Sequence, residues 1–243
     1  MPGIIIYNGP SAYDGAPIVS VLVKGSTNRK TGATIQQYII REDVHPLTAS
    51  RQGLDFSVCG NCKHRGTASH DKVKGEAIGR TCYVKLHQGP RAVYDAYKRG
   101  RYPVARTVED VQKFIGGGIV RLGAYGDPAS LPDGLNDLLI SSAGAHTSYT
   151  HGHTVGETLG DNAAKYSMVS ADSIDEAIKA HNSGFRTFRV IPIRDVNAPL
   201  LKNEIMCPSD RGVKCIDCRL CNGTMSRGKN IAIIAHGVMK NKV

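Results

Sequence analysis

The chain has 243 residues, and 41% of them are hydrophobic, which is the composition of a globular protein with a sizeable core and excludes a disordered one. No stretch approaches the roughly 18 apolar residues of a membrane span, and the first residues lack the basic and apolar regions of a signal peptide. We therefore expect no membrane partner and a location in the cytoplasm. The 31 Lys and Arg residues against 21 Asp and Glu give a formal net charge of +10, which is compatible with a nucleic-acid partner or with a solvated basic surface.

The N-terminal part of the chain predicts a β-hairpin. Residues 4–8 form a short candidate strand, and residues 18–24 and 34–41 are rich in β-branched side chains on either side of a polar, glycine-containing loop. The next segment, residues 42–79, is polar and rich in Gly, His and Lys, so we expect little regular structure there. Pro90 then opens a helix that ends at Gly100.

From residue 107 onward, helical and extended patterns alternate. Thr107 and Asp110 have the spacing of a helix N-cap for residues 107–114, and Ser173 begins a second capped helix that ends before Gly184. Another helix is expected over residues 136–142, and strands are expected over residues 119–125, 146–150, 166–170, 185–191 and 231–235. This alternation is typical of βα units and a parallel sheet.

These patterns predict an α/β fold: a partial (β/α) barrel, or an open and mostly parallel sheet, with an N-terminal β-hairpin and cysteine-rich metal-binding loops. We divide the chain into a hairpin with a cysteine-rich segment, residues 1–106, and a βα-repeat core with a four-cysteine site, residues 107–243. The two parts are expected to form one compact unit. In such folds, ligands bind at the carboxyl ends of the strands.

The carboxyl ends of five expected strands carry polar side chains. Asp127 or His151 is the first choice for acid–base chemistry, although Asp127 and Asp172 are each equally well explained as turn or cap residues. The candidate catalytic and substrate-binding residues at these ends are Asp127, Tyr149, His151, Asp172 and His236, with His153, Ser170, Arg194 and Asp195 beside them.

Four of the seven cysteines lie close together near the C-terminus. Cys207, Cys215, Cys218 and Cys221 have the spacing C-x7-C-x2-C-x2-C, and two-residue gaps let a chain turn around a metal with its sulfurs facing inward. Four thiolates suit a tetrahedral zinc ion or an iron–sulfur cluster. Bacterial ferredoxins also contain consecutive two-residue gaps, which favours the cluster.

The other three cysteines, Cys59, Cys62 and Cys82, form a second candidate ligand set. In a reducing cytoplasm, grouped cysteines are more often ligands or catalytic groups than disulfides. If the fourth coordination position stays open, these thiolates suit a substrate-binding zinc ion or a [4Fe–4S] cluster with one free iron. A metal-free arrangement and one site shared by both groups also remain open. A structural zinc ion would need a fourth ligand, for which three histidines are candidates: His64, His70 and His87.

Several blocks of the sequence, which together extend over nearly the whole chain, resemble a family of uncharacterised, cysteine-rich bacteriophage and prophage proteins. They include GPRAVYDAYKRGRYP at residues 89–103 and VRLGAYGDP at residues 120–128, and the others are residues 57–84, 149–151, 168–172, 184–190 and 207–221. More distantly, the order of cysteines, Gly-Asp and Tyr-Thr is similar to that of radical S-adenosylmethionine (SAM) proteins with partial (β/α) barrels. The spacing C-x2-C-x19-C differs from the C-x3-C-x2-C signature of that class.

This resemblance implies a phage-encoded protein of the host-cell cytoplasm. Our leading hypothesis is a metal-binding, iron–sulfur enzyme of unidentified substrate, with SAM as a candidate cofactor. Cys59, Cys62 and Cys82 would hold a reactive cluster with an open coordination position, and the four later cysteines would hold a second cluster or a structural zinc ion. The alternative is a basic, zinc-stapled protein that binds nucleic acid without catalysis.

Overall fold

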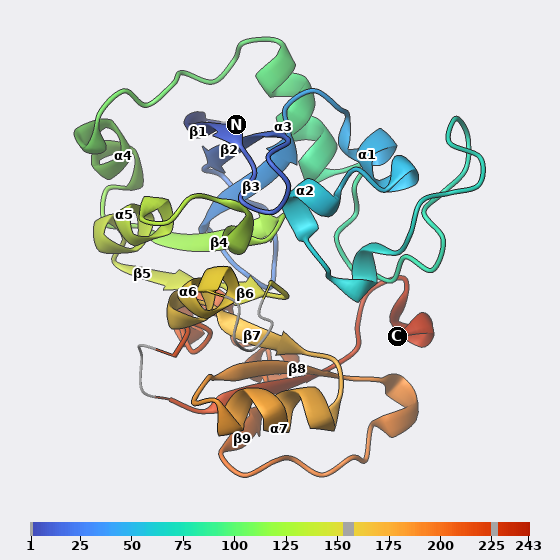
Figure 1. The fold of residues 1–243 in the computed structure, drawn as a ribbon. Helices are drawn as coiled ribbons and strands as arrows, with labels where there is room; N and C mark the ends of the chain where they lie inside the picture. Colours follow the sequence, from blue (N-terminus) through green and yellow to red (C-terminus); the bar gives the residue numbers. More distant parts are fainter. Residues whose placement is uncertain (1, 153–157, 225–227) are drawn as a thin grey trace.

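The structure, a computed structural model of the chain, describes residues 2–152, 158–224 and 228–243. Its strands form two five-stranded sheets, seen one above the other in Figure 1. The first sheet contains, in spatial order, β1 (Gly3–Pro10), β2 (Pro17–Val23), β3 (Ile35–Arg41), β4 (Ile119–Tyr125) and β5 (Ala145–Thr147). The second contains, in spatial order, β6 (Tyr149–Thr150), β7 (Met168–Ala171), β8 (Thr187–Ile191), β10 (Asn230–Ile234) and β9 (Glu204–Met206).

The first sheet is mixed and the second is parallel. β2 pairs antiparallel with β1 and β3, as the predicted hairpin requires, whereas β4 pairs parallel with β3 and β5. Every neighbouring pair of the second sheet is parallel. The α/β class is therefore confirmed, but the described strands divide between two sheets and form no closed barrel. Because β3 pairs with β4, the first sheet contains strands from both of the expected parts of the chain, residues 1–106 and 107–243.

The two sheets meet at Ser148. The strand predicted over residues 146–150 is in fact two short strands, β5 and β6, with only Ser148 between them. The N–H of Ser148 donates to the carbonyl of Cys221 (2.8 Å), and its own carbonyl accepts from the N–H of Met168 (3.0 Å). Ser148 is fully buried, so these bonds satisfy its backbone where the chain passes from one sheet to the other.

The helices lie outside the two sheets. Thr107 and Asp110 form a capping box at the start of α4, and the Ser173 hydroxyl accepts a hydrogen bond from the Glu176 N–H at the start of α7, so both predicted caps are confirmed. The helices are α1 (Pro46–Gln52), α2 (Phe56–Cys59), α3 (Gly89–Lys98), α4 (Val108–Ile115), α5 (Leu135–Ser142), α6 (Thr158–Tyr166), α7 (Ile174–Asn182) and α8 (Cys215–Cys218).

The segment of residues 42–79 is more regular than its composition indicates, because it contains α1 and α2. The side chain of His45 accepts a hydrogen bond from the N–H of Leu47 and caps α1, and Pro46 occupies the first turn, where its missing N–H has no helical partner to lose. The expectation of little regular structure was wrong for these residues. Their role is to bring Cys59, at the end of α2, beside the first sheet.

Hydrophobic clusters cover both faces of the first sheet. Ile4 and Ile5 are neighbours in β1 and belong to different clusters, as the alternation of side chains along a strand requires. The cluster around Ile5 includes Val93 of α3, and the cluster around Ile4 includes Ile115 of α4. The second sheet has smaller clusters, one of them around Met168. In the described part of the chain, no helix is both long and apolar enough to span a membrane.

Candidate functional site

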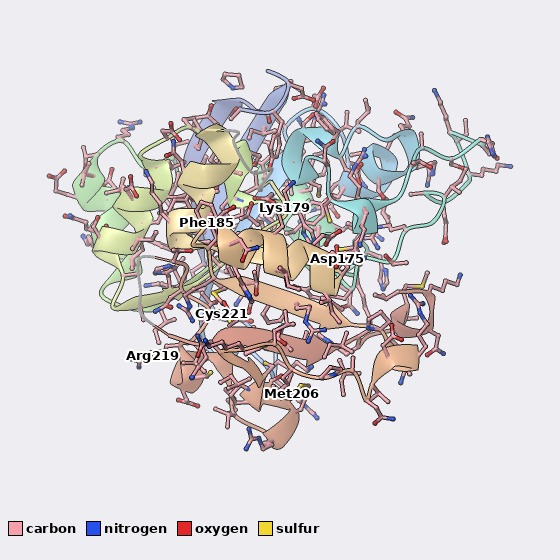
Figure 2. The ribbon with its side chains drawn as sticks, turned by 60° about the horizontal axis from the view of Figure 1, so that its bottom comes forward. Asp175, Lys179, Phe185, Met206, Arg219 and Cys221 are labelled. Atoms are coloured by element: carbon pink, nitrogen blue, oxygen red, sulfur yellow. The ribbon has the colours of Figure 1, made fainter. Side chains whose placement is uncertain are left out.

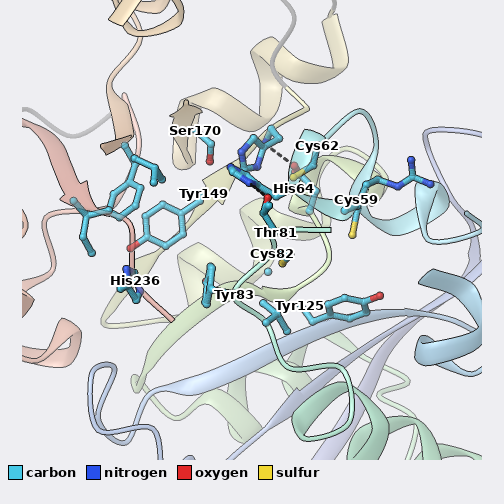
Figure 3. Close-up of a pocket in the computed structure, with 18 of the residues that line it drawn as sticks. Cys59, Cys62, His64, Thr81, Cys82, Tyr83, Tyr125, Tyr149, Ser170 and His236 are labelled. Carbon is cyan, nitrogen blue, oxygen red and sulfur yellow. Dashed lines mark hydrogen bonds between the residues drawn. The ribbon is translucent and has the colours of Figure 1, made fainter. Parts of the chain in front are cut away.

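A cavity of about 350 Å³ lies between the two sheets (Figure 3). Five strands reach it with one of their last two residues: β4 with Tyr125, β6 with Tyr149, β7 with Ser170, β8 with Val190 and β10 with Ile233. The predicted convergence of strand ends on one site is therefore confirmed for these strands. Since a cavity of this volume holds a small organic ligand, the strand ends can supply both its walls and its polar contacts.

The residues predicted at the strand ends divide into two classes. Those that line the cavity are Asp127, Tyr149, His151, Ser170 and His236. Asp172 lies just behind the wall and contacts the ring of His151. Arg194 and Asp195 are on the surface, with 72% and 53% of their side chains exposed, so they take no part in the site. His153 lies outside the described residues.

Cys59, Cys62 and Cys82 all line the cavity, although Cys82 comes from a loop about 20 residues after the other two. Cys59 ends α2, and Cys62 precedes a short 3-10 helix, residues Lys63–Arg65. The backbone carbonyl of His64 accepts hydrogen bonds from the N–H groups of Thr81 (3.0 Å) and Cys82 (2.9 Å). These bonds tie the Cys82 loop to the Cys62 loop. Burial raises the pKa of both Cys59 and Cys82. The Asp55 carboxylate and the neighbouring thiols raise the pKa of Cys59 further, whereas Arg80 opposes the rise at Cys82.

His64, His151 and Asp172 form a compact group beside these thiols. His64 Nε2 lies 2.8 Å from Asp172 Oδ1, and His151 Nε2 lies 3.5 Å from Asp172 Oδ2. The other ring nitrogen of His64 lies 2.6 Å from the Thr81 hydroxyl, which fixes the orientation of the ring (Figure 3). The donor atoms of the three residues all lie within 4.8 Å of one another, a spacing that one metal ion can bridge.

Neighbouring charges determine the direction of the pKa shifts of Asp172 and His151. Burial alone would raise the pKa of Asp172, but His151 and His64 outweigh it and hold that pKa well below its usual range. Burial would lower the pKa of His151, but the Cys62 thiol and the Asp172 carboxylate outweigh it and raise that pKa well above its usual value. His151 Nε2 is buried and makes no hydrogen bond within the described part of the chain. Its contact with the Asp172 carboxylate is the 3.5 Å ion pair described above.

Asp127 holds the loop that carries His151. Its carboxylate accepts hydrogen bonds from the Thr150 hydroxyl (2.8 Å) and from the N–H groups of Ala129 (3.0 Å), His151 (2.7 Å) and Gly152 (3.1 Å). Burial raises the pKa of Asp127, and these donors oppose the rise. With both oxygens occupied, Asp127 acts on the site through the position of His151. A role in acid–base chemistry therefore remains a prediction.

The four later cysteines gather at a second, smaller cavity. Cys207, Cys215, Cys218 and Cys221 all line a space of about 20 Å³, and Cys207 and Cys215 also line the large cavity. Figure 2 shows Cys221 below α7, near Arg219. Burial raises the pKa of Cys221 to about 12. The N–H of Cys215 donates to the carbonyl of Lys30, so the loop between β2 and β3 anchors α8.

The donor spacing tests how well each group suits a metal. Around a single ion, three or more donors must lie close together, and in the described ranges only His64, His151 and Asp172 do so. Neither cysteine group reaches that spacing. Thiolates that hold an iron–sulfur cluster bind different iron atoms and need not meet around one point. Ligation by either cysteine group remains a prediction, and the shared walls of the two cavities make the groups neighbours.

Comparisons of the chain with models of known protein families, with curated proteins and with solved structures gave no significant match. The resemblance to bacteriophage proteins and to radical SAM proteins therefore remains a prediction.

Two features of this site were not predicted. The contact of His64 with Asp172 joins residues 108 positions apart, and no local pattern marks it. The only sequence signal is that His64 follows Cys62 by two positions, so a loop that brings one into the cavity also brings the other. The second feature is Arg121, a buried residue of β4 that lines the cavity. In the sequence, Arg121 stands between the apolar residues Val120 and Leu122 of a predicted strand, and this pattern does not indicate a ligand-binding residue.

Proposed function

We propose that the protein is a metal-dependent enzyme whose chemistry takes place in the cavity between the two sheets. One observation carries the proposal: thiol, imidazole and tyrosine side chains from distant parts of the chain line a single cavity of about 350 Å³. A protein that used its cysteines only as structural staples would have no need to direct them at a space of this size. Pockets of this volume in enzymes bind small molecules.

The two cysteine groups suit two different metal sites. The four-cysteine cavity of about 20 Å³ has room for a single ion, and four thiolates are the ligand set of structural zinc. Cys59, Cys62 and Cys82 line the large cavity, and as three ligands of a [4Fe–4S] cluster they would leave one iron free to bind a ligand. Such a cluster would supply one-electron chemistry, with SAM as the candidate co-substrate.

The residues beside the first cysteine group would orient and protonate the substrate. Asp127 fixes the His151 backbone, while Asp172 and Thr81 fix the rings of His151 and His64. Rigid positioning of this kind is what a site for general acid–base catalysis needs. The strand order β3-β4-β5, continued after Ser148 by β6-β7-β8-β10, supports the proposal of a partial (β/α) barrel around the cavity.

Metal analysis of the protein isolated without oxygen tests this proposal. We expect iron and inorganic sulfide together with zinc. We also expect a brown protein whose visible absorption is lost when oxygen destroys the cluster. Cys62→Ser should remove the iron and sulfide and leave the zinc, whereas Cys218→Ser should remove the zinc and leave the iron. Each variant is the matched control for the other, because both exchange one thiol for a hydroxyl.

A colourless protein that contains only zinc would contradict the iron–sulfur version of the proposal. If zinc is then lost from Cys62→Ser as well, the large cavity holds a catalytic zinc ion instead. If neither variant changes the metal content, the cysteines are not ligands and the proposal fails.

A second candidate function is nucleic-acid binding, and it is favoured by the exposed basic side chains of α3 and the loop after it. Those side chains are Arg91, Lys98, Arg99, Arg101 and Arg106. Phosphate-driven binding weakens steeply with salt, so titration with DNA and RNA at two salt concentrations tests this function. Exchange of Arg99 and Arg101 for Gln should reduce the binding and leave the metal content unchanged.

A further inference from the structure

Arg121 is a buried cation without an acidic partner in the described part of the chain. It is 8% exposed, and one of its terminal nitrogens donates a hydrogen bond to the hydroxyl of Tyr83 (2.5 Å). It makes no ion pair with any described residue, whereas Arg189, which is 3% exposed, pairs with Glu204. A buried charge that lacks a counter-charge is costly, so an anion bound in the cavity would stabilise Arg121.

The surroundings of Arg121 direct it at the cavity. It lines the large cavity, and so do Lys30, Tyr83 and His236. The groups that act on it electrically are the hydroxyls of Tyr38, Tyr83 and Tyr149 and the Cys215 thiol, all of them uncharged at neutral pH in their free forms. Burial lowers the pKa of His236, Lys30 and Arg121 lower it further, and the Asp210 carboxylate opposes them. Of these charged groups, the two cations line the cavity and Asp210 does not, so this end of the cavity is electropositive.

The four-cysteine site is close to Arg121, because Cys215 lines the same large cavity and its thiol acts electrostatically on the guanidinium. No hydrogen bond joins the two side chains within the described part of the chain. Arg121 does not belong to the wall of the smaller cavity, and its described side-chain hydrogen bond goes to Tyr83, which lines only the large one. The unused nitrogens are therefore free to bind a ligand in the large cavity.

We propose that the cavity binds a small organic anion whose carboxylate or phosphate group is held by the Arg121 guanidinium. This names the ligand class of the site described above, and it rests on the proposed function in that respect. The planar fork of an arginine binds either group through two parallel hydrogen bonds. Aromatic rings of Tyr125, Tyr149 and Phe188 also line the cavity and give the organic part of the ligand apolar contact.

Three simple probes test the proposal: benzoate, phenyl phosphate and the uncharged benzamide. Binding is measured by equilibrium dialysis at constant ionic strength on the protein as isolated. We expect the wild type to bind at least one anion, Arg121→Gln to bind it at least tenfold more weakly, and Arg121→Lys to retain part of the affinity. The matched control is Lys113→Gln, which removes one positive charge from an exposed side chain of α4 and should bind as the wild type does.

Comparison of the two anions separates a carboxylate site from a phosphate site. Equal binding of an anion by wild type and Arg121→Gln, binding of benzamide as tight as that of benzoate, or no binding of either anion would overturn the proposal. Thermal denaturation of Arg121→Gln without ligand shows whether the variant is folded, and Arg121→Lys provides the second test if it is not. Metal content measured on the same samples separates the two claims. Loss of anion binding in Arg121→Gln with unchanged metal content supports the role of Arg121, whereas absence of metal from the wild type contradicts the proposed function.

Discussion

Arg189 and Glu204 form a buried, two-bond ion pair in the second sheet. Arg189 Nε and Nη2 lie 2.9 Å and 2.6 Å from the two carboxylate oxygens of Glu204, and both side chains are almost fully buried. The pair spans β8 and β9 across the intervening strand β10, where the residue opposite Arg189 is Ala232. A methyl group at that position leaves room for the arginine to cross. The N–H of Leu201 also donates to Glu204 (2.9 Å).

The stability of the fold should depend on the ionisation of Glu204. Burial would raise its pKa, but the hydrogen bonds from Arg189 and Leu201 outweigh burial and lower it. The stabilisation is therefore present above the ordinary glutamate pKa of 4.5 and is lost as the pH falls through the lower pKa of the folded state. At pH 7, Glu204→Gln should cost about 3–5 kcal/mol of unfolding free energy, because it leaves the buried Arg189 charge unpaired.

Urea denaturation at pH 7 and at progressively lower pH measures this effect. The double variant Arg189→Met with Glu204→Leu is the control, because it removes both charges and should recover much of the loss. A Glu204→Gln variant as stable as the wild type at pH 7 would show that the pair contributes nothing.

Asp127 shows how far residue types alone predict a site. Its place after a strand correctly put it in the cavity wall, because the end of a β-strand in an α/β fold is recognisable from local sequence. Its four donors could not be predicted, because three of them come from residues 23 to 25 positions later. The number of hydrogen bonds that a carboxylate receives depends on tertiary structure. It is this number that makes Asp127 a positioning residue here.

At the scale of elements, the capping box of α4 is the feature that the sequence predicts best. All of its hydrogen bonds lie within four consecutive residues, so the local sequence is sufficient to predict it. Thr107→Ala should lower the unfolding free energy by about 1 kcal/mol, because the N–H of Asp110 loses its acceptor. Thr107→Ser keeps the hydroxyl and should be nearly neutral. Chemical denaturation of the two variants measures the difference, and equal stability would mean that the cap does not contribute.

The elements that prediction missed depend on distant partners. The continuous extended stretch of residues 146–150 predicted one strand, yet its two halves belong to different sheets. The division is made at Ser148 by the backbone groups of Met168 and Cys221, and these lie 20 and 73 positions further along the chain. β9 is three residues long and was not predicted, because a strand that short carries no periodic pattern.

At the scale of the whole molecule, the four-cysteine group lies where several parts of the fold meet. The carbonyl of Cys221 binds Ser148 between the sheets, and α8 is anchored on the loop between β2 and β3 through Lys30 and Thr31. A metal bound there would stabilise both sheets at once, since binding to the folded state alone adds to the unfolding free energy. Cys59 instead lies at the end of α2, and Cys62 and Cys82 lie on loops that line the large cavity.

Metal removal should therefore affect the two sites differently. A strong zinc chelator, or Cys221→Ser, should lower the melting temperature of the whole protein in one cooperative transition, whereas Cys62→Ser should lower it less. The chelator should have no further effect on a Cys221→Ser sample that is already free of zinc, which is the internal control. Differential scanning calorimetry measures the transitions. A larger loss in Cys62→Ser than in Cys221→Ser would reverse this assignment of the structural site.

The strand order of the second sheet has a consequence for biosynthesis. β10 is the last strand to be translated, yet it lies between β8 and β9, and Ile233 and His236 from this part of the chain complete the cavity wall. All seven cysteines precede it, so they leave the ribosome before the wall can form. If these thiols bind metal, uptake can therefore begin on the nascent chain, before insertion of the final strand between β8 and β9 completes the wall.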